Sequence, residues 1–240
     1  IHGDQVLELM RTNYTSFQIC DLDQDGRKEV AVIQTGVTEE SNRVLLYKYR
    51  DGILEMDSAA PLSRNVTGLP DGGVRIGALQ GNIPALFVSS TYGISGTAQS
   101  FMDSAYGESG HITDIFAWKE GRLQNITLSP ETGESDNTIR WYTAVGARDI
   151  NKDGILELPD PYALPDPSST SVAVNFWAIR WRQYDINGEA HPVFTTYYNE
   201  RDSWYFILPD EWDNKITVSR NDMAGGGERA VIFSYWEGDP

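Results

Sequence analysis

Two acidic segments, each nine residues long, constrain the fold of this chain more than any other feature of its sequence. Loop 1 is residues 21–29 and loop 2 is residues 149–157, which begins 128 residues later. Both carry Asp or Asn at positions one, three and five, glycine at position six and Glu at position nine. Oxygens at this spacing can converge on one hard cation, while glycine permits the sharp turn that brings them together.

The pattern predicts two Ca²⁺ sites, because carboxylate and carbonyl oxygens are the ligands that calcium prefers and clustered carboxylates repel one another without a cation. The predicted ligands are the side chains of Asp21, Asp23, Asp25 and Glu29 with the carbonyl of Arg27, and those of Asp149, Asn151, Asp153 and Glu157 with the carbonyl of Ile155. The alternative is a solvated turn without an ion. We expect each ion to hold its loop rather than to act chemically, since five protein ligands leave few coordination positions open.

An EF-hand shares the first half of this pattern but needs an acid at position twelve and a following helix. Position twelve is Val32 in loop 1 and Asp160 in loop 2. The segment after loop 1 is apolar and β-branched, and the segment after loop 2 contains Pro161 and Pro165, which oppose a helix. Both loops are therefore predicted to lie between strands.

A second repeated feature is a hairpin pattern of aromatic, any, aromatic, two polar residues, glycine, any and leucine. It occurs at residues 47–54 and again at 116–123, which is 69 residues later, with a looser copy at 179–188 and the start of a fourth at 233. Each copy places an acid or Asn before glycine, where a tight hairpin needs positive φ. A unit of about 60 to 70 residues with roughly four strands therefore recurs, which is characteristic of propeller blades.

We predict an all-β fold, a propeller-like array of about four four-stranded antiparallel blades. The 12 Tyr, 7 Trp, 8 Phe and 22 Gly favour short strands joined by turns. The chain is predicted to be a single repeat-built domain, 1–240, with blades at 12–65, 66–132 and 133–200 and an incomplete blade at 201–240. Because closed propellers have about four to eight blades, these units form part of a longer propeller or an incompletely closed one. One short helix is expected near residues 5–11, and exposed loops at 89–110 and 159–167.

Charge and cysteine content narrow the classes of function. With 35 Asp and Glu against 19 Lys and Arg, the net charge of −16 opposes nucleic acid as a partner. The single cysteine, Cys20, excludes internal disulfides, and the scattered His2, His111 and His191 weigh against a transition-metal enzyme. No stretch approaches the ~20 apolar residues that span a bilayer. The chain begins at Ile1 without an apolar leader, so we expect any signal peptide to have been removed.

The aromatic residues offer two interpretations, a surface for stacking sugars or a core between blades. Their recurrence at one position of the repeat favours the core for Tyr47, Tyr49, Phe116, Trp118, Trp177 and Trp181. Better candidates for an exposed platform lie outside the repeat, at Tyr92, Tyr106, Trp204 and Trp212. No nucleophile motif and no distinct acid pair stands out, so no catalytic or cofactor-binding residue is assigned.

The two loops resemble the calcium loops of FG-GAP/VCBS-type repeats, the β-propeller repeats of integrin α-subunit heads and of many bacterial secreted or surface proteins. Residues 17–21 before loop 1 and 29–32 at its end follow that pattern. The Phe-Gly and Gly-Ala-Pro signatures of the family do not occur, and the second and fourth units lack the acidic ligands. The resemblance implies structural Ca²⁺, an extracellular or cell-envelope location, and recognition of protein or carbohydrate through blade loops.

Three classes of function remain open. The first is a non-catalytic, calcium-stabilised extracellular module that recognises an unidentified protein or glycan. The second is a carbohydrate-active enzyme or its accessory domain, and the third is a purely structural envelope protein. A secreted or surface protein, or a lipoprotein anchored through a leader outside this chain, agrees with a lone thiol and with millimolar calcium outside cells. The sequence does not specify the oligomeric state.

Overall fold

The computed structural model describes residues 7–36, 38–93, 110–165, 176–224, 226 and 228–236. Strands predominate in these residues, and the only helices there are three short 3₁₀ turns, η1 (Glu39–Ser41), η2 (Asp136–Thr138) and η3 (Asp210–Trp212). The predicted all-β class is confirmed. The chain divides into two compact units: unit 1 is Ile1–Glu157 with Gln183–Ala190, and unit 2 is Leu158–Arg182 with His191–Pro240.

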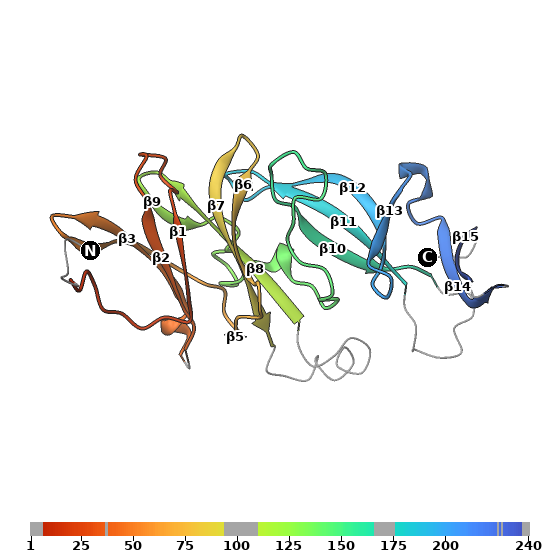
Figure 1. Cartoon of the computed structure of the whole chain (residues 1–240), viewed down its shortest axis with the longest axis horizontal. Helices are drawn as coiled ribbons and strands as arrows, with labels where there is room; N and C mark the ends of the chain where they lie inside the picture. Colours follow the sequence, from red (N-terminus) through yellow and green to blue (C-terminus); the bar gives the residue numbers. More distant parts are fainter. Residues whose placement is uncertain are drawn as a thin grey trace. The chain divides into compact units, whose positions relative to one another are not determined.

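The first sheet of unit 1 has four antiparallel strands in sequence order (Figure 1), which are β1 (Ser16–Cys20), β2 (Glu29–Gln34), β3 (Arg43–Arg50) and β4 (Ile53–Pro61). Because side chains alternate between the faces of a strand, one face of this sheet gathers apolar residues into the core. The contributing residues include Cys20, Ala31, Ile33, Val44, Leu46 and Ala60.

The second sheet of unit 1 has five strands, which are β5 (Val66–Gly68), β6 (Val74–Leu79), β7 (Ile83–Tyr92), β8 (Gly110–Lys119) and β9 (Arg122–Asn125). β7 pairs with β5, β6 and β8, all antiparallel. Leu86, Val88, Ile112 and Phe116 from this sheet join the same buried cluster as the first sheet. Part of the loop expected at 89–110 is therefore strand, since β7 continues to Tyr92; residues 94–109 lie outside the described residues.

The repeated hairpin pattern forms turns as predicted. Asp51 and Gly52 have φ of 47° and 96° between β3 and β4, and Glu120 and Gly121 have φ of 52° and 75° between β8 and β9. Positive φ at both central residues matches the twist of the flanking strands. In the third copy Gly188 has φ of 79°. The acid-glycine pairs thus determine where these strands reverse.

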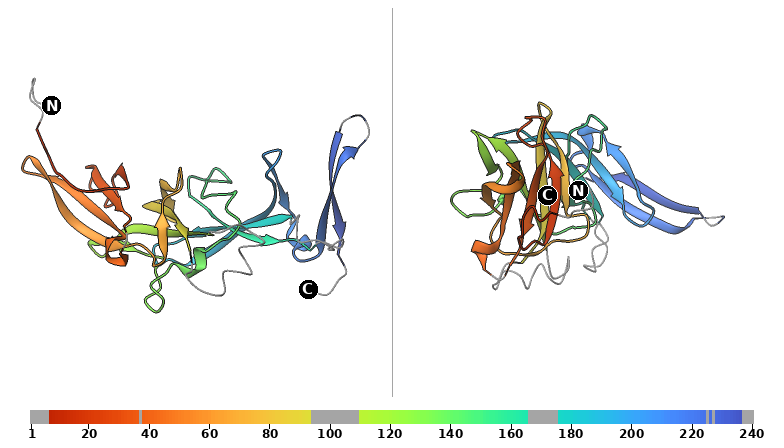
Figure 2. Two further views of the ribbon diagram at one scale, coloured as in Figure 1. Left: turned by 90° about the horizontal axis from the view of Figure 1, so that it is seen from below. Right: turned by 60° about the vertical axis from the view of Figure 1, so that its left-hand side comes forward.

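Unit 2 contains most of a four-stranded antiparallel sheet and a two-stranded ribbon (Figure 2). The sheet strands, in order, are β10 (Leu158–Ala163), β11 (Trp177–Tyr184), β12 (Ala190–Asn199) and β13 (Trp204–Leu208), and the ribbon strands are β14 (Ile216–Ala224) and β15 (Glu228–Tyr235). Their shared core comprises Leu164, Ala178, Tyr197, Leu208, Ile216 and Val218.

Two local predictions are wrong. Residues 159–163 of the loop expected at 159–167 belong to β10, because β10 lies at the edge of its sheet, where proline without an N–H is tolerated. Residues 166–167 lie outside the described residues. Residues 7–11, the described part of the expected helix, have no regular secondary structure. In the described residues the sheets have four, five, four and two strands. The propeller-like arrangement and the blade limits stay predictions.

The described residues contain no helix with the length and apolar character needed to cross a bilayer.

Candidate metal centres

Loop 1 connects β1 to β2 and gathers its acids around a common centre. One carboxylate oxygen from each of Asp21, Asp23, Asp25 and Glu29 lies within 4.8 Å of the others. The structure thus brings together all four side chains predicted as ligands in this loop. Such a cluster of oxygen donors has the composition of a site for a hard cation.

The backbone of loop 1 is shaped by its own side chains. Asp23 Oδ1 accepts a hydrogen bond from the Asp25 N–H at 3.1 Å, and Asp25 Oδ1 accepts one from the Arg27 N–H at 2.7 Å. Asp side chains favour such turns because they bond to the backbone two residues ahead. Gln24 and Gly26 adopt φ of 59° and 86°, which curls the chain between these bonds. Arg27 is thus held to the loop through its N–H, which donates to Asp25.

Glu29 anchors loop 1 to the core. Its side chain is 1 % exposed, and its Oε2 accepts a hydrogen bond of 2.8 Å from the N–H of Leu22, which is itself buried. Burial raises the pKa of Glu29, and the charges of Asp23 and Asp21 raise it further. A cation within the cluster would offset both effects.

Asp21 supplies a direct indication that a ligand fits loop 1. Its Oδ1 is buried and has no hydrogen-bond partner among the described residues. A buried acceptor without a partner costs about 1–3 kcal/mol. The donor chemistry of loop 1 therefore suits a divalent cation that would coordinate this oxygen.

Lys48 on β3 contributes to the charge balance of loop 1, and the sequence analysis did not identify it. Its Nζ lies 2.6 Å from Asp23 Oδ2 and 3.8 Å from Asp57 Oδ2, and it sits 4.1 Å from the centre of the Trp118 ring. Burial alone would raise the pKa of Asp23, but the Lys48 and backbone hydrogen bonds outweigh it and lower that pKa. Lys48 thus balances one of the four negative charges of loop 1. No motif marked it, because it is 25 residues from Asp23 in sequence.

Loop 2 repeats the frame of loop 1. Oxygens of Asp149, Asp153 and Glu157 lie within 4.8 Å of one another. Lys152 and Gly154 have φ of 65° and 90°, at positions 128 residues after Gln24 and Gly26. The two backbones therefore share the same left-handed positions.

Two hydrogen bonds of loop 2 match bonds of loop 1. Glu157 Oε2 accepts the Ile150 N–H at 2.9 Å, as Glu29 accepts that of Leu22, and Asp153 Oδ1 accepts the Ile155 N–H at 2.8 Å. Burial raises the pKa of Glu157, which is fully buried, as it does for Glu29. Asp149 differs from Asp21, because its Oδ1 accepts the Asp153 N–H at 3.1 Å and its Oδ2 accepts the Gly154 N–H at 3.0 Å.

Loop 2 differs in how its charge is balanced. Gln183 Nε2 donates to Asp153 Oδ2 and to Glu157 Oε1, both at 2.7 Å. Asn151 Nδ2 donates to Asp153 Oδ2 at 2.8 Å, and Asn151 Oδ1 accepts the Asp153 N–H at 3.0 Å. Loop 2 therefore carries three acids against two neutral amides, so both loops have a similar net local charge.

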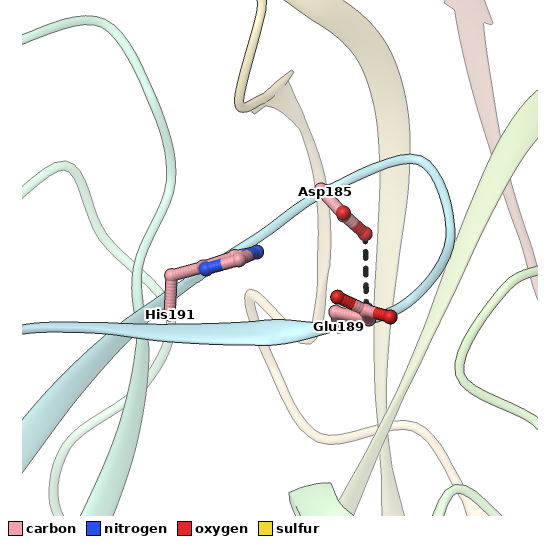
Figure 3. Close-up of side chains that lie close together, drawn as sticks. All are labelled: Asp185, Glu189 and His191. Atoms are coloured by element: carbon pink, nitrogen blue, oxygen red, sulfur yellow. Dashed lines mark hydrogen bonds between the residues drawn. The ribbon is translucent and has the colours of Figure 1, made fainter.

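A third group that sequence analysis did not select lies in the β11–β12 hairpin, where Asp185, Glu189 and His191 have ligating atoms within 4.8 Å (Figure 3). Asp185 Oδ1 accepts the N–H groups of Asn187 at 2.8 Å and of Glu189 at 3.0 Å. These bonds belong to the turn itself and account for the position of Asp185. We assign no metal to this group.

The aromatic predictions have mixed outcomes. Phe116 and Trp181 are 0 % and 1 % exposed, as expected for core residues, but Tyr49 is 56 % exposed. Tyr92, expected on the surface, is 2 % exposed and donates a hydrogen bond to Glu134 Oε2 at 2.7 Å. Tyr106 lies outside the described residues.

Comparison of this chain with protein-family models, with curated proteins and with solved structures finds no match.

Proposed function

We propose that this chain is a non-catalytic, calcium-stabilised recognition module of the extracellular or cell-envelope type, built from propeller-type blades like those of FG-GAP/VCBS repeats. Its ligand would be a protein or a carbohydrate. The observation that carries the proposal is the equivalence of loops 1 and 2 in acidic sequence, left-handed backbone positions and buried glutamate anchor. Repetition of a strained, acid-rich turn is expected where each copy holds an ion.

Calcium fits the donor set better than other common cations. In loops 1 and 2 every clustered donor atom is a carboxylate oxygen. Zinc sites usually include nitrogen or sulfur ligands, so this donor set suits zinc less well. Calcium accepts 6–8 oxygens in flexible geometry, whereas Mg²⁺ demands a near-ideal octahedron and retains several waters. At extracellular concentrations, sites with Kd of roughly 10⁻⁴ to 10⁻³ M would be filled.

The arrangement favours a structural role for the ion. Loop 1 joins β1 to β2, and loop 2 closes on itself through reciprocal backbone bonds between Arg148 and Glu157. The two acids whose pKa is raised in the loops, Glu29 and Glu157, are buried against backbone N–H groups. An acid catalyst needs access to substrate, so these glutamates are suited to hold the loop.

The test is calcium binding by calorimetry together with thermal unfolding in CaCl₂ and in EDTA. We expect two sites in the wild type, one in Asp25→Ala or Asp153→Ala, and none in the double variant. At ten times Kd each site adds about 1.4 kcal/mol, or about 2–4 °C in melting temperature for a chain of this size.

The matched control is Asp71→Ala, since Asp71 is an exposed acid outside both loops. It should bind and melt as the wild type does. The absence of binding heat in the wild type, or identical melting in CaCl₂ and in EDTA, would contradict the proposal.

A further inference from the structure

A groove of about 580 Å³ lies at the end of the first sheet opposite loop 1. Its lining comprises residues 13–15 before β1, Gln34 at the end of β2, residues 35–36 after it, Thr38, then Glu40 and Ser41 of η1, and Arg43 at the start of β3. Loop 1 follows the other end of β1 and precedes β2. The groove is therefore separate from the candidate calcium centre.

Most residues that line the groove carry a polar group. Among the described lining residues, each one except Gly36 carries a hydroxyl, amide, carboxylate or guanidinium group. Sites for typical drug-sized ligands are lined predominantly by apolar side chains. This groove is instead suited to a ligand that is itself rich in hydrogen-bonding groups.

Several of these groups are fixed by bonds within the lining. Gln34 Oε1 accepts from Arg43 Nε at 3.0 Å, and Gln34 Nε2 donates to the Asn13 carbonyl at 2.7 Å. The hydroxyls of Thr15 and Thr35 lie 2.9 Å apart and share a hydrogen bond. Such bonds lower the entropy lost when a ligand is bound.

Two charged groups in the lining are available to a ligand. The Nη groups of Arg43 and the carboxylate of Glu40 have no hydrogen bond or ion pair with any residue that the structure describes. Guanidinium donates two parallel N–H bonds and carboxylate accepts two O–H bonds. Each can therefore engage a pair of neighbouring hydroxyls.

An oriented aromatic ring lies in the same groove. Tyr14 is 63 % exposed, and its ring meets that of Phe17 edge to face at 5.7 Å and 85°. Edge-to-face contact favours one orientation of the ring. The exposed Tyr14 side chain offers an aromatic ring on which a sugar ring can stack through its C–H groups.

We propose that this groove binds a neutral saccharide, which stacks on Tyr14 and bonds through its hydroxyls to Arg43 and Glu40. This inference rests on the proposed recognition function and specifies its ligand class. The net charge of −16 opposes acidic polymers. Glu40 is the one carboxylate in the described lining.

The test is affinity electrophoresis of the full chain in gels that contain a β-glucan, a xylan, a galactomannan or the acidic polymer polygalacturonate. At least one neutral polysaccharide should retard the wild type. Tyr14→Ala and Arg43→Ala should each weaken binding at least about tenfold, which corresponds to about 1.4 kcal/mol, while Tyr14→Phe keeps the stacking and the binding.

The matched control is Tyr49→Ala, which removes a similarly exposed tyrosine near the far end of β3. It should migrate as the wild type does. Retardation by none of the neutral polymers overturns the inference, as does retardation by polygalacturonate alone or binding that survives both Tyr14→Ala and Arg43→Ala. Unchanged melting of Tyr14→Ala and Arg43→Ala verifies that their loss of binding is not a loss of the fold.

The calcium experiment separates this inference from the proposed function. If saccharide binding persists while calorimetry detects no calcium binding, the calcium assignment is wrong and the saccharide assignment of the groove is retained. If both calcium sites fill but no saccharide binds, the groove assignment fails alone.

Discussion

At the residue scale, buried acids define the candidate centres. Glu29 and Glu157 are 1 % and 0 % exposed, and each accepts one backbone N–H from the loop that precedes it. A buried charge is costly unless it is paired or hydrogen-bonded. The acidic spacing therefore predicts the loops, but Lys48 and Gln183, which satisfy part of that charge, come from strands far away in sequence.

His111 on β8 predicts a pH dependence of stability. Burial, reinforced by the charge of Arg140, lowers its pKa from 6.5 to about 4. Between these values the unfolded chain binds a proton that the folded chain does not, so stability is full above about pH 6.5 and falls as the pH approaches 4.

Between pH 7 and pH 4.5 the free energy of unfolding should fall by about 1–2 kcal/mol less in His111→Gln than in the wild type, a figure that allows for solvent screening. Urea unfolding of both proteins in EDTA measures this difference, because EDTA keeps metal binding out of the comparison. Parallel losses in the two proteins would show that His111 does not titrate in this way.

At the scale of elements, turn chemistry decides where strands reverse. Gly52, Gly121 and Gly188 of the repeated hairpins adopt positive φ, and the spacing of the pattern alone predicted these turns. The prolines of β10 were misleading, because an edge strand accepts proline and the sequence does not reveal which strand forms an edge.

Gly188 tests the hairpin between β11 and β12. It has φ of 79°, and a Cβ there would overlap the carbonyl oxygen of Ile126. We expect Gly188→Ala to lower the free energy of unfolding by about 2–3 kcal/mol.

The matched control is Gly121→Ala, because Gly121 has φ of 75° but no atom within 4 Å of an added Cβ. It should cost only about 1 kcal/mol, the penalty of the left-handed conformation. If chemical denaturation shows an equal loss of unfolding free energy in Gly188→Ala and Gly121→Ala, the contact with Ile126 is unimportant.

At the scale of the whole molecule, both candidate centres belong to one unit. Loops 1 and 2, Lys48 and Gln183 all lie in unit 1. Metal removal should therefore lower the local stability of unit 1, since a ligand stabilises the part of the fold that binds it.

We expect EDTA to accelerate amide hydrogen exchange in β1, β2 and residues 148–157 by about tenfold, the factor that corresponds to about 1.4 kcal/mol. The β14–β15 ribbon of unit 2 should exchange at an unchanged rate. Faster exchange throughout the chain would contradict this localisation, as would an unchanged exchange rate in loops 1 and 2.

The sequence by itself determined the all-β class, the two acidic turns and the repeated hairpins. These features depend on φ preferences and on hydrogen bonds between residues only a few positions apart, so a short segment contains all the information needed. The tertiary structure decided the burial of Tyr92, the contacts of Lys48 and Gln183 with the acids, and the groove beside Tyr14. Each of these depends on which distant strands pair and which faces they bury, and local spacing does not encode that choice.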